Sequence, residues 1–387
     1  MFDFDEVIDR TKSSCEKWDK YKGQNIIPAW VADMDFKSPP CVIEALEQRV
    51  REGVFGYTGV DEETYDAIIS FIKRHYDWEI QKEWVVFTHG VVSSMNLACL
   101  SVDTQSVMTT TPIYPHFIKA PHYAQKEVLA IAMKEENNRW VLDYEAMEAT
   151  ITPTCKLFML CNPYNPAGTV FTCKELEALS AFCLKHDLTL CSDEIHADLL
   201  LNPDAKHIPI ASLNEAIAQK SITLMAPSKT FNIAGLQASF AIIPSFELRK
   251  RFQKTMGSMV GGVNLLGLCA LKAAYTDGDA WLKALRLYLA DNLKMVQDFV
   301  AKNPKLKLLN QEATFLAWID VSALHVKSPY AFFLSFGVGL SDGEPFGNKQ
   351  FVRLNFGTRR ALLVQILDKM QDAMDSLKKE ENNERCH

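Results

Sequence analysis

The sequence predicts an α/β fold built on a mostly parallel, seven-stranded sheet. Between residues 84 and 243, short apolar runs bounded by turn formers alternate with segments of helical periodicity. Such alternation is typical of a parallel sheet covered by helices. After residue 260 helical patterns dominate, which is typical of a smaller α+β domain. A chain of 387 residues is also too long for one ordinary core, so we expect two domains.

Seven apolar runs are the strand candidates of the larger sheet. Each is short, rich in apolar and β-forming residues, and bounded by turn formers. They cover residues 84–88, 106–109, 127–131, 156–161, 188–192, 221–225 and 238–243. Residues 91–100 and 173–185, which lie between these runs, show a helical period instead.

The remaining segments predict an arm and a second domain. Helical patterns cover 262–275, 280–302 and 359–379, and strand-like runs cover 314–319 and 351–355. The first forty residues carry few periodic signals. We therefore divide the chain into an N-terminal arm (1–40) that packs with the small domain, a large cofactor-binding domain (41–278) and a small C-terminal domain (279–387).

Composition narrows the classes of protein that the chain can belong to. A formal net charge of -7 gives no footprint for nucleic acid or an anionic membrane, and no apolar stretch reaches membrane-spanning length. The ten cysteines form no Cys-x-x-Cys pair, which favours buried reduced thiols and a reducing compartment. The start of the chain lacks the features of a secretory signal. We therefore expect a cytoplasmic protein. The histidines show no metal-ligand spacing, so we expect no metal site.

Three polar motifs follow three of the predicted strands. They are 162–168 (NPYNPAG), 192–196 (SDEIH) and 227–232 (PSKTFN). Residues just past the carboxyl ends of parallel strands face one crevice, so the Asn165 amide, the Asp193 carboxylate and the Lys229 amine are expected together. That set suits pyridoxal 5′-phosphate, whose aldehyde reacts with a lysine and whose ring nitrogen pairs with an acid. Taken singly, a turn asparagine, a helix-capping aspartate and a surface lysine remain open alternatives.

Further motifs extend the pattern over nearly the whole chain. With 30–36 (WVADMDF), 55–58 (FGYT) and 351–355 (FVRLN), the chain resembles the fold-type I pyridoxal phosphate enzymes, and most closely their aminotransferase-like cystathionine β-lyases, also called cysteine-S-conjugate β-lyases. The DEIH motif separates this branch from most aminotransferases, which carry tyrosine where this chain has His196. The resemblance implies an aspartate aminotransferase-like fold with pyridoxal 5′-phosphate as cofactor.

The resemblance also implies roles around the cofactor ring. Lys229 would hold the cofactor covalently and then act as the catalytic base, while Asp193 would keep the ring nitrogen protonated. Asn165 would donate to the phenolic oxygen, with His196 near the same edge. Tyr114 would stack on the ring face and take part in catalysis, although an ordinary core aromatic remains an open alternative.

The phosphate has a different set of expected contacts. Residues 90–92 begin a helix after a strand, and free backbone N–H groups at a helix start can bind phosphate. A simple strand-to-helix turn is the open alternative there. By resemblance, a hydroxyl and a residue of the partner subunit complete the site. The expected phosphate contacts are Gly90, Val91, Val92, Ser228 and Tyr57.

Substrate binding and assembly follow from the same resemblance. Arg353 would hold the α-carboxylate of an amino acid substrate through a bidentate pair, with Asn165 and Tyr57 beside it. Because Tyr57 would reach the site of the partner subunit, a homodimer with shared active sites is expected. The departures from the aminotransferase pattern include Gln237, which replaces the usual phosphate-binding arginine, and Ala226, which lacks the hydroxyl often found there.

These observations favour one activity and leave two others open. We expect a carbon–sulfur β-lyase that converts L-cystathionine, L-cysteine or other cysteine S-conjugates to pyruvate, ammonia and a thiol by α,β-elimination. A class I/II aminotransferase is one alternative, because Lys229 can serve either reaction. A pyridoxal phosphate-binding regulator with residual lyase activity is the other.

Overall fold

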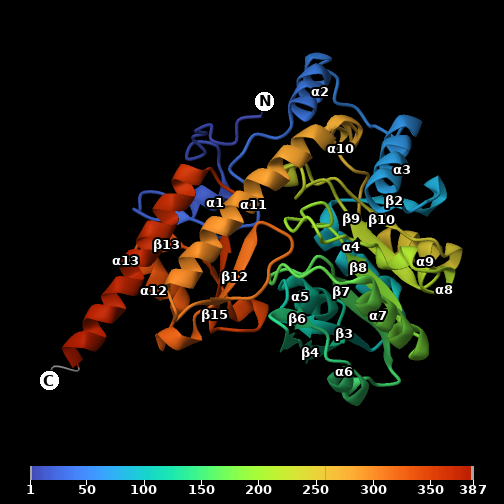
Figure 1. Ribbon diagram of the computed structural model, residues 1–387. Helices are drawn as coiled ribbons and strands as arrows, with labels where there is room; N and C mark the ends of the chain where they lie inside the picture. The colour runs from blue at the N-terminus through green and yellow to red at the C-terminus, as the bar shows by residue number, and fades with distance from the viewer. Residues whose placement is uncertain (1, 258, 385–387) are drawn as a thin grey trace.

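The computed structural model describes residues 2–257 and 259–384 and is shown in Figure 1. At its centre is a seven-stranded sheet with the order β2-β10-β9-β8-β7-β3-β4. Its strands are β2 (Val85–Thr88), β3 (Ser106–Thr111), β4 (Glu127–Ala132), β7 (Cys155–Cys161), β8 (Thr189–Asp193), β9 (Ser221–Met225) and β10 (Ser239–Ile242). Only β10 runs antiparallel to its neighbours. The predicted α/β fold with a mostly parallel seven-stranded sheet is confirmed.

The register of the central strands brings their carboxyl ends to one edge. Cys161 pairs with Asp193, and Asp193 pairs with Leu224, so β7, β8 and β9 end side by side. All five residues of β9 are buried, including the polar Ser221 and Thr223, as expected of a strand in the middle of a sheet that is covered on both faces. The loops that follow these three strands carry the polar motifs.

Helices cover the large sheet and extend beyond it. They are α2 (Pro40–Arg51), α3 (Glu62–Tyr76), α4 (Gly90–Ser101), α5 (His116–Tyr123), α6 (Tyr144–Thr150), α7 (Cys173–Lys185), α8 (Glu215–Ala218), α9 (Phe246–Met256) and α10 (Leu265–Asp277). Helix α4 packs on β8, β9 and β10, whereas α2 and α3 pack on α10. Helix α7 begins where Thr172 and Glu175 form a capping box.

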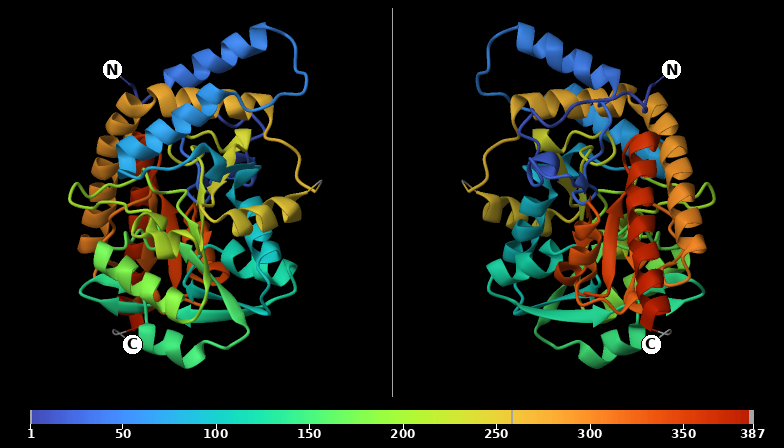
Figure 2. Two further views of the ribbon diagram at one scale, coloured as in Figure 1. Left: turned by 90° about the vertical axis from the view of Figure 1, so that its right-hand side faces the viewer. Right: turned by 90° about the vertical axis from the view of Figure 1, so that its left-hand side faces the viewer.

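A second, antiparallel sheet has the order β11-β12-β15-β14. It consists of β11 (Lys307–Leu308), β12 (Leu316–Asp320), β14 (Ser341–Asp342) and β15 (Phe351–Asn355). The helices of this part are α11 (Asp279–Lys302), α12 (Pro329–Ser335) and α13 (Arg360–Glu384). Helices α11 and α13 contact each other and run along the same side of the molecule in both views of Figure 2.

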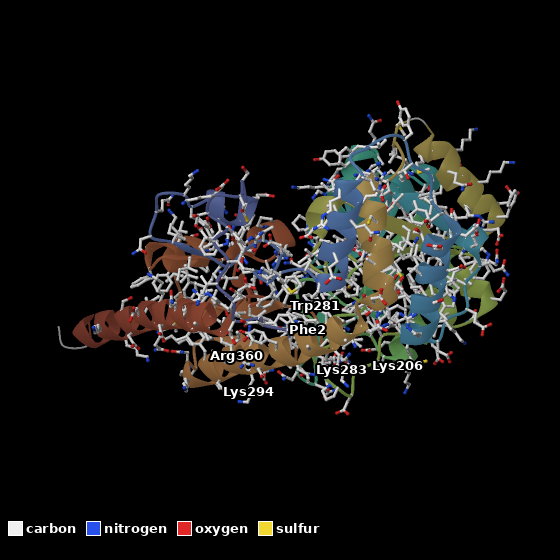
Figure 3. All side chains as sticks on the ribbon, turned by 90° about the horizontal axis from the view of Figure 1, so that it is seen from above. Phe2, Lys206, Trp281, Lys283, Lys294 and Arg360 are labelled. Carbon is white, nitrogen blue, oxygen red and sulfur yellow. The ribbon has the colours of Figure 1, made fainter. Side chains whose placement is uncertain are left out.

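The N-terminal segment packs against elements of the C-terminal part of the chain. It contains α1 (Glu16–Asp19) and β1 (Ile27–Pro28), and β1 pairs in parallel with β13 (Val338–Gly339). The ring of Phe4 packs against Trp281 of α11 at a centroid distance of 5.6 Å. Phe2 and Trp281 line the same small pocket and are labelled in Figure 3.

The smaller elements complete the chain. Strands β5 (Lys134–Glu136) and β6 (Arg139–Val141) form a hairpin. Single turns of 3-10 helix cover Lys82–Trp84, Ile210–Ser212, Ala234–Leu236, Ser322–Leu324 and Glu344–Phe346. In the parts of the chain that the structure describes, no helix combines the length and apolarity needed to span a membrane.

Most predicted element bounds agree with the structure, and the differences have local causes. The seven strands of the large sheet lie within two residues of their predicted ranges. The predicted helix from residue 262 was wrong by three residues, because Asn264 caps α10 by accepting from the amide of Gly267 at 2.7 Å. The predicted strand at 314 begins instead at Leu316, since Thr314 has a φ of 70°. Helix α13 runs past residue 379 to Glu384.

Candidate active site

A cleft of about 580 Å³ lies where the loops after β7, β8 and β9 meet the N-terminal segment. Helix α4 begins at one end of it, and β15 contributes from the second sheet. Ten of the eleven sequence-predicted site residues line this cleft. They are Gly90, Val91, Val92, Tyr114, Asn165, Asp193, His196, Ser228, Lys229 and Arg353.

The amine of Lys229 points toward the N-terminal segment. Its Nζ donates a hydrogen bond to the backbone carbonyl of Ala32 at 2.8 Å. The pKa of Lys229 is lowered to about 8: burial is the main cause and the charge of Arg353 contributes, while the carboxylates of Asp33 and Asp193 oppose the shift. A lysine with this pKa is partly neutral near physiological pH, as a nucleophile and a base need to be.

Asp193 is the last residue of β8 and is almost fully buried. One of its oxygens, Oδ1, accepts from the amide of Ile195 at 3.1 Å. The pKa of Asp193 is raised to about 7: burial is the main cause and the neighbouring Glu194 contributes, while the Ile195 amide and Lys229 oppose the shift. A buried carboxylate in this state gains from a cationic N–H partner, because ion pairing then offsets the desolvation of its charge.

His196 lies in the same buried layer and is a neutral imidazole. Burial lowers the pKa of His196 to about 3, and the charges of Lys229 and Arg353 contribute. Its Nδ1 atom is buried without a hydrogen-bond partner among the residues that the structure describes. Buried polar atoms are rarely left unpaired, so this nitrogen is suited to a polar atom of a bound group.

Arg353 extends from β15 into the cleft and is held by neutral acceptors. Its guanidinium donates to Asn165 Oδ1 and to the Trp30 carbonyl, each at 3.0 Å, and to Ser341 Oγ at 3.3 Å. The side chain stacks over the ring of Phe346 at 4.6 Å. Burial lowers the pKa of Arg353 to about 10. Among the described residues no carboxylate forms an ion pair with it, so a carboxylate ligand would supply the counter-charge.

The contact with Arg353 also orients the amide of Asn165. A guanidinium only donates hydrogen bonds, so the amide oxygen must face Arg353. The amide NH₂ group of Asn165 then remains available to donate to a ligand. This geometry agrees with the donor role that the sequence predicts for Asn165.

The start of α4 also lines the cleft. Gly90 has a φ of 75°, and a Cβ atom at this position would meet nothing within 4 Å. The first N–H groups of a helix lack helical partners and attract anions. Ser228 and Gln237 line the same cleft, and Lys229 and Arg353 are its only lysine and arginine among the described residues. Any phosphate here is therefore bound mainly by backbone and hydroxyl donors.

The two predicted tyrosines differ in their surroundings. Tyr114 lines the cleft, and burial raises its pKa. Tyr57 does not line it: this side chain is fully exposed on the loop between α2 and α3. Within a single chain, therefore, the structure does not bring Tyr57 to the other site residues.

Sequence reasoning missed two backbone groups in the site. The carbonyls of Trp30 and Ala32 accept from Arg353 and Lys229, respectively. Their segment was recognised only as a motif that marks a branch of a family. A carbonyl acceptor leaves no side-chain signature, so only the position of the motif next to the cleft reveals this role.

Taken together, these groups fit pyridoxal 5′-phosphate. Asp193 matches the ring nitrogen, Asn165 and His196 match the polar ring edge, and the start of α4 matches the phosphate. Lys229 would supply the amine that reacts with the aldehyde. Arg353, which donates to Asn165 and to the Trp30 carbonyl, has no carboxylate partner among the described residues and would be left for the carboxylate of a second molecule.

Comparisons with known proteins agree with this geometry. Residues 31–370 match the family described as aminotransferase class I and II. Cystathionine beta-lyase PatB of Bacillus subtilis is 35% identical over 385 residues, covering 96% of this chain and 99% of that protein. The crystal structure of OvoB has a TM-score of 0.94 and 47% identity, covering 96% of this chain and 99% of that one. Cystalysin from Treponema denticola, whose structure contains pyridoxal 5′-phosphate, has a TM-score of 0.93 and 32% identity, covering 97% of this chain and all of that one.

Proposed function

The chain belongs to the aminotransferase class I and II family, and from this premise we propose that it is a pyridoxal phosphate-dependent carbon–sulfur β-lyase. Its cofactor is pyridoxal 5′-phosphate. The proposed substrates are L-cystathionine, L-cysteine and other cysteine S-conjugates. The proposed products are pyruvate, ammonia and the released thiol.

The observation that carries the proposal is the buried guanidinium of Arg353, which has no carboxylate partner among the described residues and lines the same cleft as Lys229. A buried cation without a carboxylate partner fits the α-carboxylate of an amino acid. The lysine, whose pKa of about 8 leaves part of it neutral at pH 7, fits a base for the Cα proton. The cleft therefore suits proton abstraction at the α-carbon of an amino acid.

Each site residue has a defined part in the proposed reaction. Arg353 and Asn165 hold the substrate so that its Cα–H bond faces Lys229 Nζ, which takes the proton. The cofactor, when bound, supplies an electron sink for the charge left at Cα, and Asp193 keeps the ring nitrogen protonated. Loss of the thiolate from Cβ then breaks the carbon–sulfur bond. Water completes the conversion of the three-carbon fragment to pyruvate and ammonia.

An aminotransferase is the second candidate, because the matching family is described by that activity. Both reactions begin with the same proton transfer, for which Lys229 serves equally well. They diverge afterwards: elimination needs a leaving group at Cβ, whereas transfer needs a proton delivered to the cofactor. The relative identified as a cystathionine beta-lyase favours elimination.

One experiment distinguishes these activities. Purified protein loaded with cofactor is given L-cystathionine, and pyruvate and free thiol are measured over time. We expect equal amounts of both products, and none from Lys229→Ala. Exchange of the amino group with added keto acids, without release of thiol, would instead establish the aminotransferase. Equal pyruvate from the variant would show that Lys229 is not the base.

The proposal extends to assembly. Tyr57 is fully exposed in one chain, on a loop whose apolar residues Val54 and Phe55 are exposed as well. We infer that this loop packs against a second copy and delivers Tyr57 to the phosphate of the partner site. The proposed enzyme is therefore a homodimer in which each site needs both chains.

A further inference from the structure

Glu16 contributes a carboxylate to the cleft that the proposed reaction does not use. It is the first residue of α1 and lines the same cleft as Arg353, Lys229 and Tyr114. Its side chain is exposed, so it lies on the solvent side of the cleft. Burial raises the pKa of Tyr114; the charge of Arg353 opposes this, and the carboxylates of Asp193 and then Glu16 add to it, so Glu16 lies near enough to Tyr114 to contribute.

Helix α1 is fixed so that Glu16 stays in this position. Lys17, the next residue, is buried and its Nζ forms an ion pair with Asp35 at 2.8 Å. The indole nitrogen of Trp30 donates to the Lys17 carbonyl at 3.1 Å. The segment that supplies the Trp30 and Ala32 carbonyls to the site therefore also anchors the turn that carries Glu16.

No cation in the described part of the chain neutralises Glu16. The nearby Lys17 pairs with Asp35, and the Nζ atom of Lys20 lies over the Trp30 ring at 4.3 Å. The two cations that line the cleft, Lys229 and Arg353, are bound to backbone carbonyls and to Asn165. Apart from Asp193, which is buried, Glu16 is the only carboxylate that lines the cleft among these residues.

The arrangement separates the charges that a substrate would meet. Arg353 attracts the α-carboxylate and Lys229 lies on the side of the reacting α-carbon, so the sulfur substituent is left to extend toward the open side of the cleft. There it meets a carboxylate without a partner. We propose that Glu16 is a specificity residue that favours cysteine S-conjugates whose sulfur substituent carries an ammonium group. This inference rests on the proposed lyase function.

The test compares two substrates of the same size and shape. S-(2-aminoethyl)-L-cysteine carries a terminal ammonium group, and S-propyl-L-cysteine carries a methyl group in its place. Because the two thiols differ as leaving groups, the informative quantity is the change in their kcat/KM ratio between variants. Glu16→Gln removes the charge and keeps the side-chain length. Asp19→Asn removes a charge from the exposed end of the same helix, outside the cleft, and is the matched control.

We expect the ratio to fall about fivefold in Glu16→Gln, the upper end for an exposed ion pair, and to stay unchanged in Asp19→Asn. Added salt lowers the wild-type ratio in the same direction. An unchanged kcat/KM ratio in Glu16→Gln, or an equal fall in both variants, overturns the inference about Glu16. The lyase proposal still holds in that case if the wild type forms pyruvate.

If the wild type forms no pyruvate from either substrate, the lyase proposal fails and the role of Glu16 is decided by binding. The dissociation constants of both amino acids are then measured from the change in absorption of the bound cofactor. A fivefold change in their ratio in Glu16→Gln supports the inference. An unchanged ratio overturns it.

Discussion

Arg353 shows how a buried cation can be kept ready for a ligand. Three neutral acceptors hold its guanidinium without cancelling its charge. We predict that Arg353→Lys, which loses the planar fork but keeps a cation, lowers kcat/KM for L-cystathionine by at least about thirtyfold. Steady-state kinetics measures this, with the exposed Arg251→Lys as control. Cofactor absorption is expected to persist. A variant that lost the cofactor instead would assign Arg353 a structural part.

The low pKa of Lys229 predicts how the cofactor-free protein takes up pyridoxal phosphate. Only the neutral amine reacts with the aldehyde, so the rate rises with pH and levels off above about pH 8. About a tenth of such lysines are neutral at pH 7, compared with roughly three in ten thousand for an ordinary lysine. Stopped-flow absorbance measures the profile. Because the Asp33 carboxylate raises this pKa, Asp33→Asn shifts the profile to lower pH. A rate still rising at pH 10 would contradict the argument.

Asp193 is expected to destabilise the cofactor-free protein at neutral and alkaline pH. Its folded pKa of about 7 lies above the ordinary value of 3.8, so its stabilising effect is complete below about pH 4 and is lost as the pH rises through 7. Asp193→Asn therefore increases the free energy of unfolding, compared with the wild type, more at pH 8 than at pH 4.5. The difference between these two gains is at most about 4 kcal/mol. Urea unfolding at both pH values measures this. The loaded variant is expected to lose most turnover. A pH-independent difference would contradict the assigned burial cost.

At the scale of elements, the start of α4 can be tested against a matched glycine. Gly90 and Gly23 have φ values of 75° and 77°, and a Cβ atom added to either would meet nothing within 4 Å. Replacing either by alanine is expected to destabilise the protein by about 1 kcal/mol, because alanine disfavours this backbone region. Only Gly90→Ala is expected to weaken binding of pyridoxal phosphate, measured by equilibrium titration of absorbance. Equal weakening in both variants would show a general loss of stability.

The elements that the sequence predicted best carry their own boundary signals. Helix α7 matches its predicted range because the capping box of Thr172 and Glu175 marks its first turn. Strand β9 also matches its predicted range, and all its residues are buried. The reversed direction of β10 carried no such signal. Whether a strand runs parallel or antiparallel depends on which strands become its neighbours. A short apolar run has the same sequence pattern in both cases.

The residues of the candidate site also differ in how far the sequence could predict them. Asn165, Asp193 and Lys229 were predictable because each follows a buried strand, and parallel strands bring such ends together. The acceptors at Trp30 and Ala32 were not, since a backbone carbonyl is present at every position of the chain. Glu16 was not predictable as a site residue, because its place in the cleft depends on how the N-terminal segment packs.

At the scale of the whole molecule, the exposed position of Tyr57 allows a test of whether each active site needs residues from both subunits. Lys229→Ala and Tyr57→Ala chains are co-expressed with different tags. In the mixed dimer, one site then has an intact Lys229 from one chain and an intact Tyr57 from the other. We expect about a quarter of wild-type lyase activity per subunit if chains pair at random, because half the dimers are mixed and each has one complete site.

The control for this experiment uses two residues of one cleft. Lys229 and Arg353 line the cleft of the same chain, so mixed dimers of Lys229→Ala and Arg353→Ala contain no complete site. No activity is expected from that pair. Activity in the Lys229→Ala and Arg353→Ala mixture would contradict the proposed sharing. So would a lack of activity in the Lys229→Ala and Tyr57→Ala mixture, provided that each variant alone is inactive.

The cleft collects its groups from positions as far apart as Ala32 and Arg353. A ribosome makes the first of these long before the last, and domains acquire structure as they emerge. A nascent chain whose Lys229 has left the ribosome before β15 therefore has the proposed reactive amine but lacks Arg353, the proposed binding group for the substrate carboxylate. Chemistry on free amino acids must await the last stretch of translation.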